Sequence, residues 1–115
     1  MALRRVALEI GFGTSLRRGD TTAAARRAVE NALWRNSLNI AQAFGFPKDA
    51  MHITVDIAAQ APETVDREAI AALFPYGLVR VTTSPGGLDI PKPDGSGRTV
   101  VVNAAITVAF DMEAA

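Results

Sequence analysis

The sequence predicts a single α+β domain over residues 1–115, with a four-stranded mixed sheet and two helices packed on one of its faces. Alternating apolar residues indicate the strands, and an alanine-rich segment with helical spacing indicates a long helix. A length of 115 residues is enough for one hydrophobic core but not for two. Short connections around the helices favour a two-layer arrangement.

The first half of the chain is expected to form a strand followed by the long helix. The strand is expected to end at Gly11-Phe12-Gly13, because glycine permits backbone conformations that other residues resist. Asp20 is suited to cap the helix, since its carboxylate can accept hydrogen bonds from free backbone amides. The helical spacing of apolar residues runs from Thr21 to about Phe44, before a glycine and a proline that end it.

The second half completes the order β-α-β-α-β-β. Its expected elements are a strand over 51–57, a short helix that Asp66 caps and that runs through Leu73, a strand over 78–83, a long loop over 84–97 and a strand over 99–111. Alternate residues of the last strand, from Val100 to Phe110, are expected to face the helices.

A second apolar surface remains that one two-layer domain cannot bury. It comprises Trp34 and Leu38, on the far side of the long helix, and the outer face of the last strand from Val101 through Asn103 to Ala109. Because exposing such a surface in water is unfavourable, we expect a homo-oligomer, with a trimer as one arrangement. The alternative is a break in the helix near Asn36-Ser37 that returns Trp34 to the core.

Composition excludes several classes of function. Twelve basic and twelve acidic residues cancel, so no nucleic-acid partner is expected. The absence of cysteine excludes disulfides, thiolate metal sites and cysteine nucleophiles. No ligand spacing supports a metal site, and no cofactor is indicated. No apolar run approaches transmembrane length and the N-terminus does not have the pattern of a signal peptide, so we expect a cytoplasmic protein without a membrane partner.

The Gly11–Ser15 segment is the first candidate binding site. It does not match a dinucleotide fingerprint, because Leu16 stands where the third glycine should be. Backbone amides near the start of the helix could hold a carboxylate, a phosphate or an oxyanion, and Arg17 and Arg18 would add charge; a plain tight turn is the alternative. The arginines of the first third form either this site or a solvated face. The expected ligand-binding residues are Gly11, Gly13, Thr14, Ser15, Arg17 and, from the long loop, Asp89.

The catalytic candidates are weak, and whether the chain is an enzyme stays open. His52 is the only histidine and shares a strand face with Asp56, but no nucleophile is obviously paired with it. Ser15 could act as a nucleophile with Lys92 or Lys48 as its base, although nothing in the sequence places these residues together.

Several short motifs, in this order, resemble a family of small conserved hypothetical proteins of bacteria and plants that is named after a Listeria open reading frame. They cover residues 7–13, Asp20 with the alanine-rich helix, 74–77, 86–91 and 103–105. The family's N-terminal motif reads Gly-x-Gly-x-Asp-x-His-Gly. Gly11 and Gly13 match it, whereas Ser15, Arg17 and Arg18 replace the Asp, the His and the last Gly.

If that Asp and His form an acid–base or metal pair, the resemblance implies that this chain has lost it, since a guanidinium does not titrate near neutrality as an imidazole does. The chain would then bind without turnover, use a different chemistry, or assemble with a paralogue that retains the pair.

A looser similarity is to single repeats of the ring-opening amidohydrolases that act on cyanuric acid and barbiturate, which place serine–lysine dyads where three repeats meet. The sequence therefore predicts a small oligomeric protein that binds an anionic or polar ligand at loops near a subunit interface. The alternative is a hydrolase of small cyclic amides with an interfacial Ser/Lys site.

Overall fold

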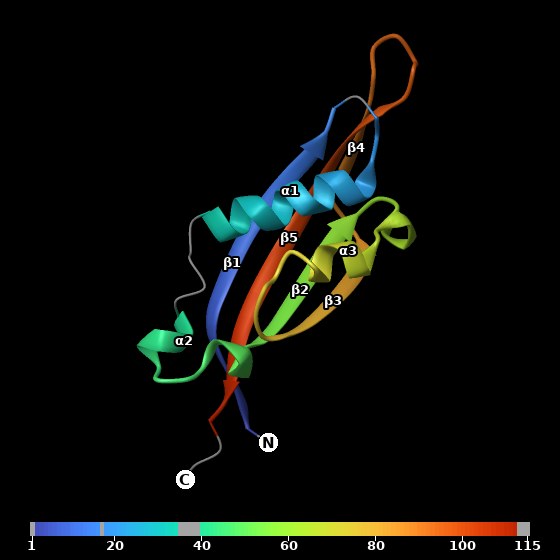
Figure 1. The fold of residues 1–115 in the computed structure, drawn as a ribbon. Helices are drawn as coiled ribbons and strands as arrows, with labels where there is room; N and C mark the ends of the chain where they lie inside the picture. The colour runs from blue at the N-terminus through green and yellow to red at the C-terminus, as the bar shows by residue number, and fades with distance from the viewer. Residues whose placement is uncertain (1, 17, 35–39, 113–115) are drawn as a thin grey trace.

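A five-stranded mixed sheet forms one layer of the protein. The computed structural model describes residues 2–16, 18–34 and 40–112. The strands are β1 (Leu3–Ser15), β2 (His52–Ala59), β3 (Leu78–Pro85), β4 (Leu88–Pro91) and β5 (Arg98–Asp111). Their order is β1-β5-β2-β3, and β4 pairs with the end of β5 that β2 leaves uncovered (Figure 1). Among the strand pairs of the described residues, only β2 and β3 are parallel to each other.

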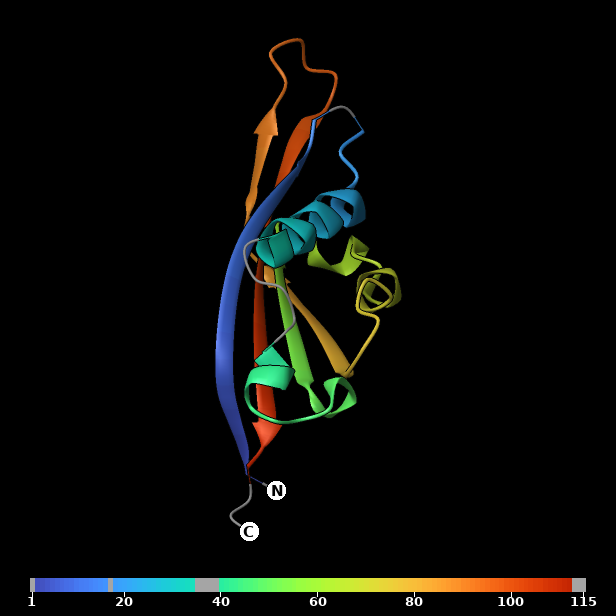
Figure 2. The same ribbon diagram turned by 60° about the vertical axis from the view of Figure 1, so that its left-hand side comes forward.

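The helices form the second layer, on one face of the sheet. They are α1 (Thr21–Trp34), α2 (Ile40–Ala43) and α3 (Arg67–Ala71), with single 3-10 turns at Lys48–Ala50 and Pro62–Thr64. Figure 2 shows all of them on the same side, while the other face of the sheet is bare. The prediction of an α+β fold with the helices on one face of a mixed sheet is thus confirmed. Within the described ranges, no helix has the length and apolar character needed to cross a bilayer.

The core lies between α1, α3 and the two central strands. The residues of β5 that were predicted to face the helices, from Val100 to Phe110, are buried, and β2 contributes alternate residues in the same way. Alanines supply most of the buried face of α1, which lets the helix lie close to the sheet. The fully buried side chains of largest volume include Phe110, Met51, Ile53, Ile57, Ile70 and Ile106.

Two aspartates cap helices as predicted. The Asp20 carboxylate accepts a 3.0 Å hydrogen bond from the backbone N–H of Ala23, at the start of α1. The Asp66 carboxylate accepts a 3.1 Å hydrogen bond from the N–H of Ala69, in α3. Each bond satisfies a backbone donor that the first turn of a helix leaves free.

The segment predicted as a loop over 84–97 instead contains β4, which forms a hairpin with the start of β5. After β3, the chain steps from the side of β2 to the side of β5 and pairs there as β4. Gly87 takes a φ of 63° at this step, a conformation that glycine adopts readily. The side-chain amide of Gln60 donates to the carbonyls of Gly86 (2.9 Å) and Gly87 (3.3 Å) and so holds the connection between β3 and β4 in place.

The end of β1 and the helical segment after it also differ from the prediction. β1 does not end at the Gly-Phe-Gly sequence but continues to Ser15, because Gly11 and Gly13 pair with β5 in regular register. Over the segment predicted as one long helix, the structure describes α1 and α2. Leu38, the Asn36-Ser37 pair and the side chain of Trp34 lie outside the described residues.

Candidate functional site

A cavity of about 650 Å³ lies between the end of β1 and the first turns of α1. Its floor comes from the last residues of β1, and its wall comes from the exposed side of α1. The lining residues are Thr14, Ser15, Leu16, Arg18, Asp20, Ala23, Arg26 and Arg27. A volume of this size is within the range of small-molecule sites, which is about 300–1,000 Å³.

Two glycines of β1 determine how closely α1 approaches the strand. A Cβ atom placed on Gly11 would stand 2.5 Å from the backbone nitrogen of Ala32, and one placed on Gly13 would overlap the backbone of Ala24 and Ala28. The helix therefore rests directly on the backbone of β1. This contact sets the start of α1 beside the end of β1, where the cavity forms.

The structure gives Gly11 and Gly13, two of the predicted ligand-binding residues, a role in packing. Both residues are buried beneath α1, and neither lines the cavity. The Gly-x-Gly spacing serves helix packing, because residues two apart in a strand face the same side and here both face the helix. Thr14 and Ser15, predicted with them, do line the cavity. Arg17 lies outside the described residues.

The cavity is positively charged. Three arginines and one aspartate leave a net charge of +2 on its lining. The carboxylate of Asp20 is engaged at the N-terminus of α1, and Arg27 donates a 2.5 Å hydrogen bond to the carbonyl of Thr14. Among residues 2–16, 18–34 and 40–112, Arg18 and Arg26 have no ion-pair or hydrogen-bond partner. Two guanidinium groups are thus available to an anion.

Ser15 holds the turn between β1 and α1. Its side chain accepts a 3.1 Å hydrogen bond from the backbone N–H of Asp20, and the residue is only 4% exposed. Gly19, with a φ of 59°, completes the turn. Ser15 is therefore a positioning residue for Asp20 in this arrangement.

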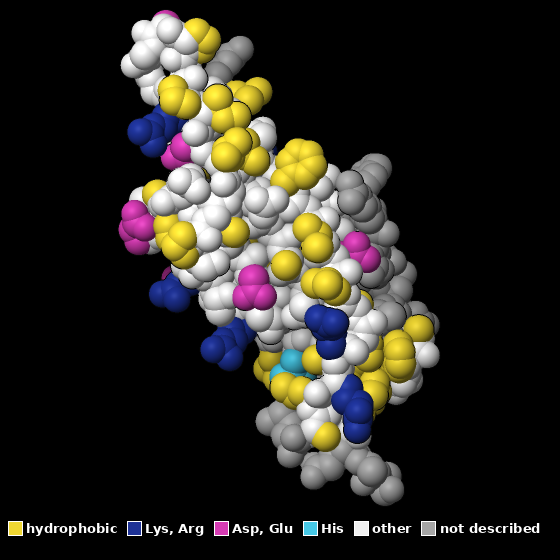
Figure 3. Space-filling model, turned by 180° about the vertical axis from the view of Figure 1, so that it is seen from behind, with side chains coloured by type: hydrophobic (Ala, Val, Ile, Leu, Met, Phe, Trp, Pro, Cys, Tyr) yellow, Lys and Arg dark blue, Asp and Glu magenta, His cyan; other side chains and the backbone are white. Residues whose placement is uncertain are grey.

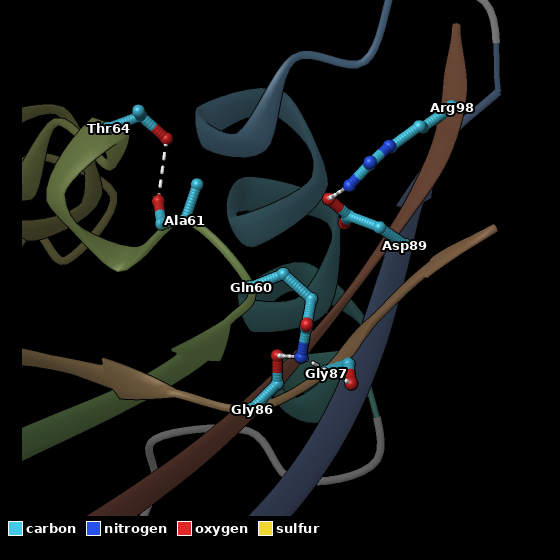
Figure 4. Close-up of polar contacts among 7 residues, drawn as sticks. All are labelled: Gln60, Ala61, Thr64, Gly86, Gly87, Asp89 and Arg98. Atoms are coloured by element: carbon cyan, nitrogen blue, oxygen red, sulfur yellow. Dashed lines mark hydrogen bonds and ion pairs between the residues drawn. The ribbon is translucent and has the colours of Figure 1, made fainter. Parts of the chain in front are cut away.

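A second cavity, of about 480 Å³, lies on the other side of the Gly19–Asp20 turn. Its lining is Gly19, Asp20, Thr21, Ala61, Thr64, Asp89, Arg98 and Val100. Asp89 forms a 3.7 Å ion pair with Arg98, and its side chain is 17% exposed (Figure 4). The Asp89 Oδ1 atom is buried and has no hydrogen-bond donor among the described residues. Asp89 thus lines this cavity, not the first one.

Ser15 lines the first cavity, whereas the other catalytic candidates, His52, Lys48 and Lys92, do not. His52 begins β2 on the bare face of the sheet, and Asp56 on the same face accepts a hydrogen bond from Thr82. Lys48 lies over the ring of Tyr76, with its Nζ atom 4.6 Å from the ring centroid. Lys92 opens the turn that joins β4 to β5. In the part of the chain that the structure describes, no group of three His, Asp or Glu residues is arranged to hold a metal ion.

Arg26 and Arg27 belong to the arginines of the first third, but they were not among the expected ligand-binding residues. A signal was present, because Asp20, Ala23 and Arg27 are spaced by three and four residues and so share one side of a helix. What the spacing does not show is that this side faces the end of β1.

Comparison with known proteins places the chain in a family and supports the fold. The model of a family described as conserved hypothetical protein (Lin0512_fam) matches residues 5–108. The fold is similar to that of a crystal structure from Nostoc punctiforme PCC 73102, described as an FtsZ-like protein of unknown function. The TM-score is 0.85 at 30% sequence identity, and the match covers 96% of this chain and 98% of that chain. No curated protein matches the sequence.

Proposed function

The chain belongs to the Lin0512 family of conserved hypothetical proteins, and we propose from the geometry of its cavities that it binds a small organic anion at the junction of β1 and α1. The observation that carries this proposal is the pair of guanidinium groups, Arg18 and Arg26, that line one cavity without a partner among the described residues. Arginine suits carboxylate and phosphate groups because its planar donors can bind two oxygens at once.

The arginines contribute more to this site than the end of the helix does. A helix N-terminus attracts anions through free backbone N–H groups. Here the side chain of Asp20 already accepts from Ala23, and the carbonyl of Asp20 accepts from Ala24 at 3.0 Å. The remaining helix dipole is also offset by the charge of Asp20. Selectivity is therefore expected to come from Arg18 and Arg26.

The cavity volume favours an anion larger than a single inorganic ion. About 650 Å³ exceeds what one phosphate group fills, and the alkyl portions of Leu16 and Ala23 give the lining apolar surface. A carboxylate or a phosphate on a small carbon skeleton would satisfy both features.

Isothermal titration calorimetry with citrate and with inorganic phosphate tests the proposal. Because a hydrogen bond to a charged group contributes about 1.5–3 kcal/mol, Arg26→Gln is expected to weaken citrate binding by roughly 10-fold or more. Arg67→Gln is the matched control, since Arg67 is exposed on α3 and lines neither cavity. Absence of binding at millimolar ligand, or equal losses in both variants, would contradict the proposal.

The alternative, a hydrolase with a Ser/Lys pair, gains no support from the positions of its residues. The Ser15 hydroxyl is buried and bonded to the turn. Lys48 is engaged with Tyr76, and Lys92 lies at the start of the β4–β5 turn. One copy of the chain therefore does not assemble the pair.

A further inference from the structure

Asp89 is a largely buried carboxylate that accepts no hydrogen bond from the described residues. Its side chain is 17% exposed, and its Oδ1 atom is buried without a donor. Its Oδ2 atom lies 3.7 Å from a nitrogen of Arg98, which is beyond hydrogen-bonding distance (Figure 4). A carboxylate that leaves water without gaining hydrogen bonds is costly to the fold. A donor from outside the chain, on a water molecule or on a ligand, would therefore stabilise it.

The strand β4 directs Asp89 toward the helix side of the sheet. Successive side chains of a strand point to opposite faces. Leu88 and Ile90 are exposed on the bare face, over which Figure 3 shows apolar side chains gathered. Asp89, between them, pairs with Val100, which is buried against the helices. The carboxylate therefore lies on the side of the second cavity, which Asp89 lines.

The second cavity is negatively charged, in contrast to the first. Its lining holds the carboxylates of Asp20 and Asp89 and the guanidinium of Arg98, which leaves a net charge of −1. The lining of the first cavity has a net charge of +2. Because a cavity attracts ions of the opposite charge, the second cavity favours a cation and the first favours an anion.

Arg98 is a weak partner for Asp89. The Arg98 side chain is 65% exposed, so water screens its charge, and ion pairs at exposed positions contribute little to stability. The 3.7 Å contact also differs from the pair of short, parallel hydrogen bonds that an arginine can form with a carboxylate. Because Oδ1 is buried, Oδ2 is the oxygen that remains open to a ligand. A cation can therefore bind Asp89 without displacing a strong interaction.

The other polar groups of the lining are mostly acceptors. Thr64 donates its hydroxyl proton to the carbonyl of Ala61 at 2.7 Å, so its oxygen can only accept from a ligand. The Asp20 carboxylate accepts from Ala23 and has further lone pairs. A primary ammonium group, which combines three donors with a positive charge, matches acceptors of this kind. Val100 and Ala61 give the lining apolar surface that suits a short alkyl chain.

The volume of the second cavity favours a ligand over a single water molecule. About 480 Å³ exceeds the roughly 30 Å³ that one water molecule occupies in the liquid and lies within the range of small-molecule sites. From the carboxylate without hydrogen bonds, the negative lining and the acceptor groups, we propose that the second cavity binds a small primary amine in its protonated form, with the ammonium group on Asp89. The site is separate from the proposed anion site, because Arg18 and Arg26 do not line it.

Titration of the full chain with butylammonium chloride, followed by NMR, tests this site. The backbone amides of Gly19, Ala61 and Asp89 are expected to shift and to saturate at millimolar ligand. Tetramethylammonium chloride has the charge but no N–H donor, and it is expected to bind roughly 10-fold more weakly or not at all. Sodium butyrate, an anion of similar size, is expected to leave these amides in place. Equal shifts with butylammonium and butyrate would overturn the proposal.

Two variants with opposite expected effects identify the group that binds the amine. Asp89→Asn keeps the shape of the side chain but removes its charge, and it is expected to weaken butylammonium binding by roughly 10-fold or more. Arg98→Gln removes a competing positive charge and is expected to strengthen binding by roughly 2-fold to 5-fold. Asp49→Asn is the matched control, since Asp49 is exposed in a 3-10 turn and lines neither cavity.

Thermal unfolding separates a binding role of Asp89 from a structural one. Because the carboxylate accepts no hydrogen bond from the described residues, Asp89→Asn is expected to keep the unfolding midpoint of the wild type. Equal losses of stability in Asp89→Asn and Arg98→Gln would assign Asp89 to the ion pair and overturn the proposal. So would a wild-type protein without saturable shifts, as expected for bound water only, or equal binding in Asp89→Asn and Asp49→Asn. Citrate binding and Arg26→Gln report on the anion site separately, so either site can fail without the other.

Discussion

Gly11 in β1 and Ala32 in α1 are in contact backbone to backbone. A Cβ atom on Gly11 would lie 2.5 Å from the nitrogen of Ala32 and 3.0 Å from its Cα atom. Neither residue carries a side chain larger than a methyl group, so the helix settles onto the strand itself. The position of the cavity at the other end of the same helix depends on this contact.

Gly11→Ala is therefore expected to destabilise the fold by about 3 kcal/mol, at the upper end of the cost of overpacking a core. The neighbouring atoms belong to the backbone and cannot move aside as the end of a flexible side chain can. Urea denaturation followed by circular dichroism measures the loss.

Gly95→Ala is the control for the effect of glycine conformation alone. Gly95 has a φ of 74° and open space around it, so alanine there meets strain but no contact. The expected loss is about 1 kcal/mol. If Gly11→Ala costs no more than Gly95→Ala, close packing of α1 on β1 is not what the glycine provides.

Asn31→Ala is expected to lower stability by about 1 kcal/mol, because the N–H of Phe12 then loses its hydrogen-bond acceptor. The specific readout is hydrogen exchange, in which the Phe12 amide should exchange faster than in the wild type. Glu30→Ala changes the adjacent exposed residue of α1 and should leave that amide unaffected. An unchanged exchange rate in Asn31→Ala would show that the Phe12 amide, on the free edge of β1, is protected by other means.

Asp66→Ala is expected to cost about 1 kcal/mol, the usual contribution of an N-cap side chain. The carboxylate accepts from the N–H of Ala69 in the first turn of a helix of only five residues. Thermal unfolding measures the change. Asp66→Asn should keep most of the stability, since an amide oxygen also caps a helix; equal losses in Asp66→Asn and Asp66→Ala would exclude capping as the cause.

Asp94 is expected to titrate below its usual pKa of 3.8. The cause is first the side-chain hydrogen bond from Ser96 and then the bond from the Ser96 backbone, 2.9 Å from Asp94 Oδ1. A carboxyl whose pKa is lowered by folding stabilises the turn above pH 3.8, and this contribution is lost as the pH falls through the lowered pKa. Carboxyl chemical shifts against pH give the value directly. Ser96→Ala should raise the pKa toward 3.8; a titration at 3.8 in the wild type would contradict the expectation.

The face assignment of β5 shows what periodicity can establish. Val100 to Phe110 alternate strictly, and in a strand that alternation fixes which residues share a side. The structure buries that set against the helices and leaves Asn103 and its neighbours on the bare face. Periodicity does not, however, say which residues of β1 lie beside them on that face. Ile10 is on the bare face because Gly11 faces the helix, which only the packing of α1 determines.

Only some residues of the candidate site could be predicted from the sequence. Thr14 and Ser15 could be predicted from their place between a strand and a capped helix, and both line the cavity. Gly11 and Gly13 were predicted to end the strand because glycine permits unusual backbone conformations, but a glycine can equally admit a close neighbour. Nothing in the local sequence separates these two uses, since the neighbour, Ala28, is distant along the chain.

The sequence by itself determined the α+β class, the aspartate caps of α1 and α3, and the two faces of β5, because each follows from local chemistry or from a periodic pattern. Only the tertiary structure decided that 88–91 pairs with β5 and that Arg26 and Arg18 line one cavity. It also decided that Leu8, Ile10 and Phe12 of β1 are exposed on the bare face of the sheet. These features depend on contacts between segments far apart in the chain, whose register is fixed when α1 packs onto the glycines of β1.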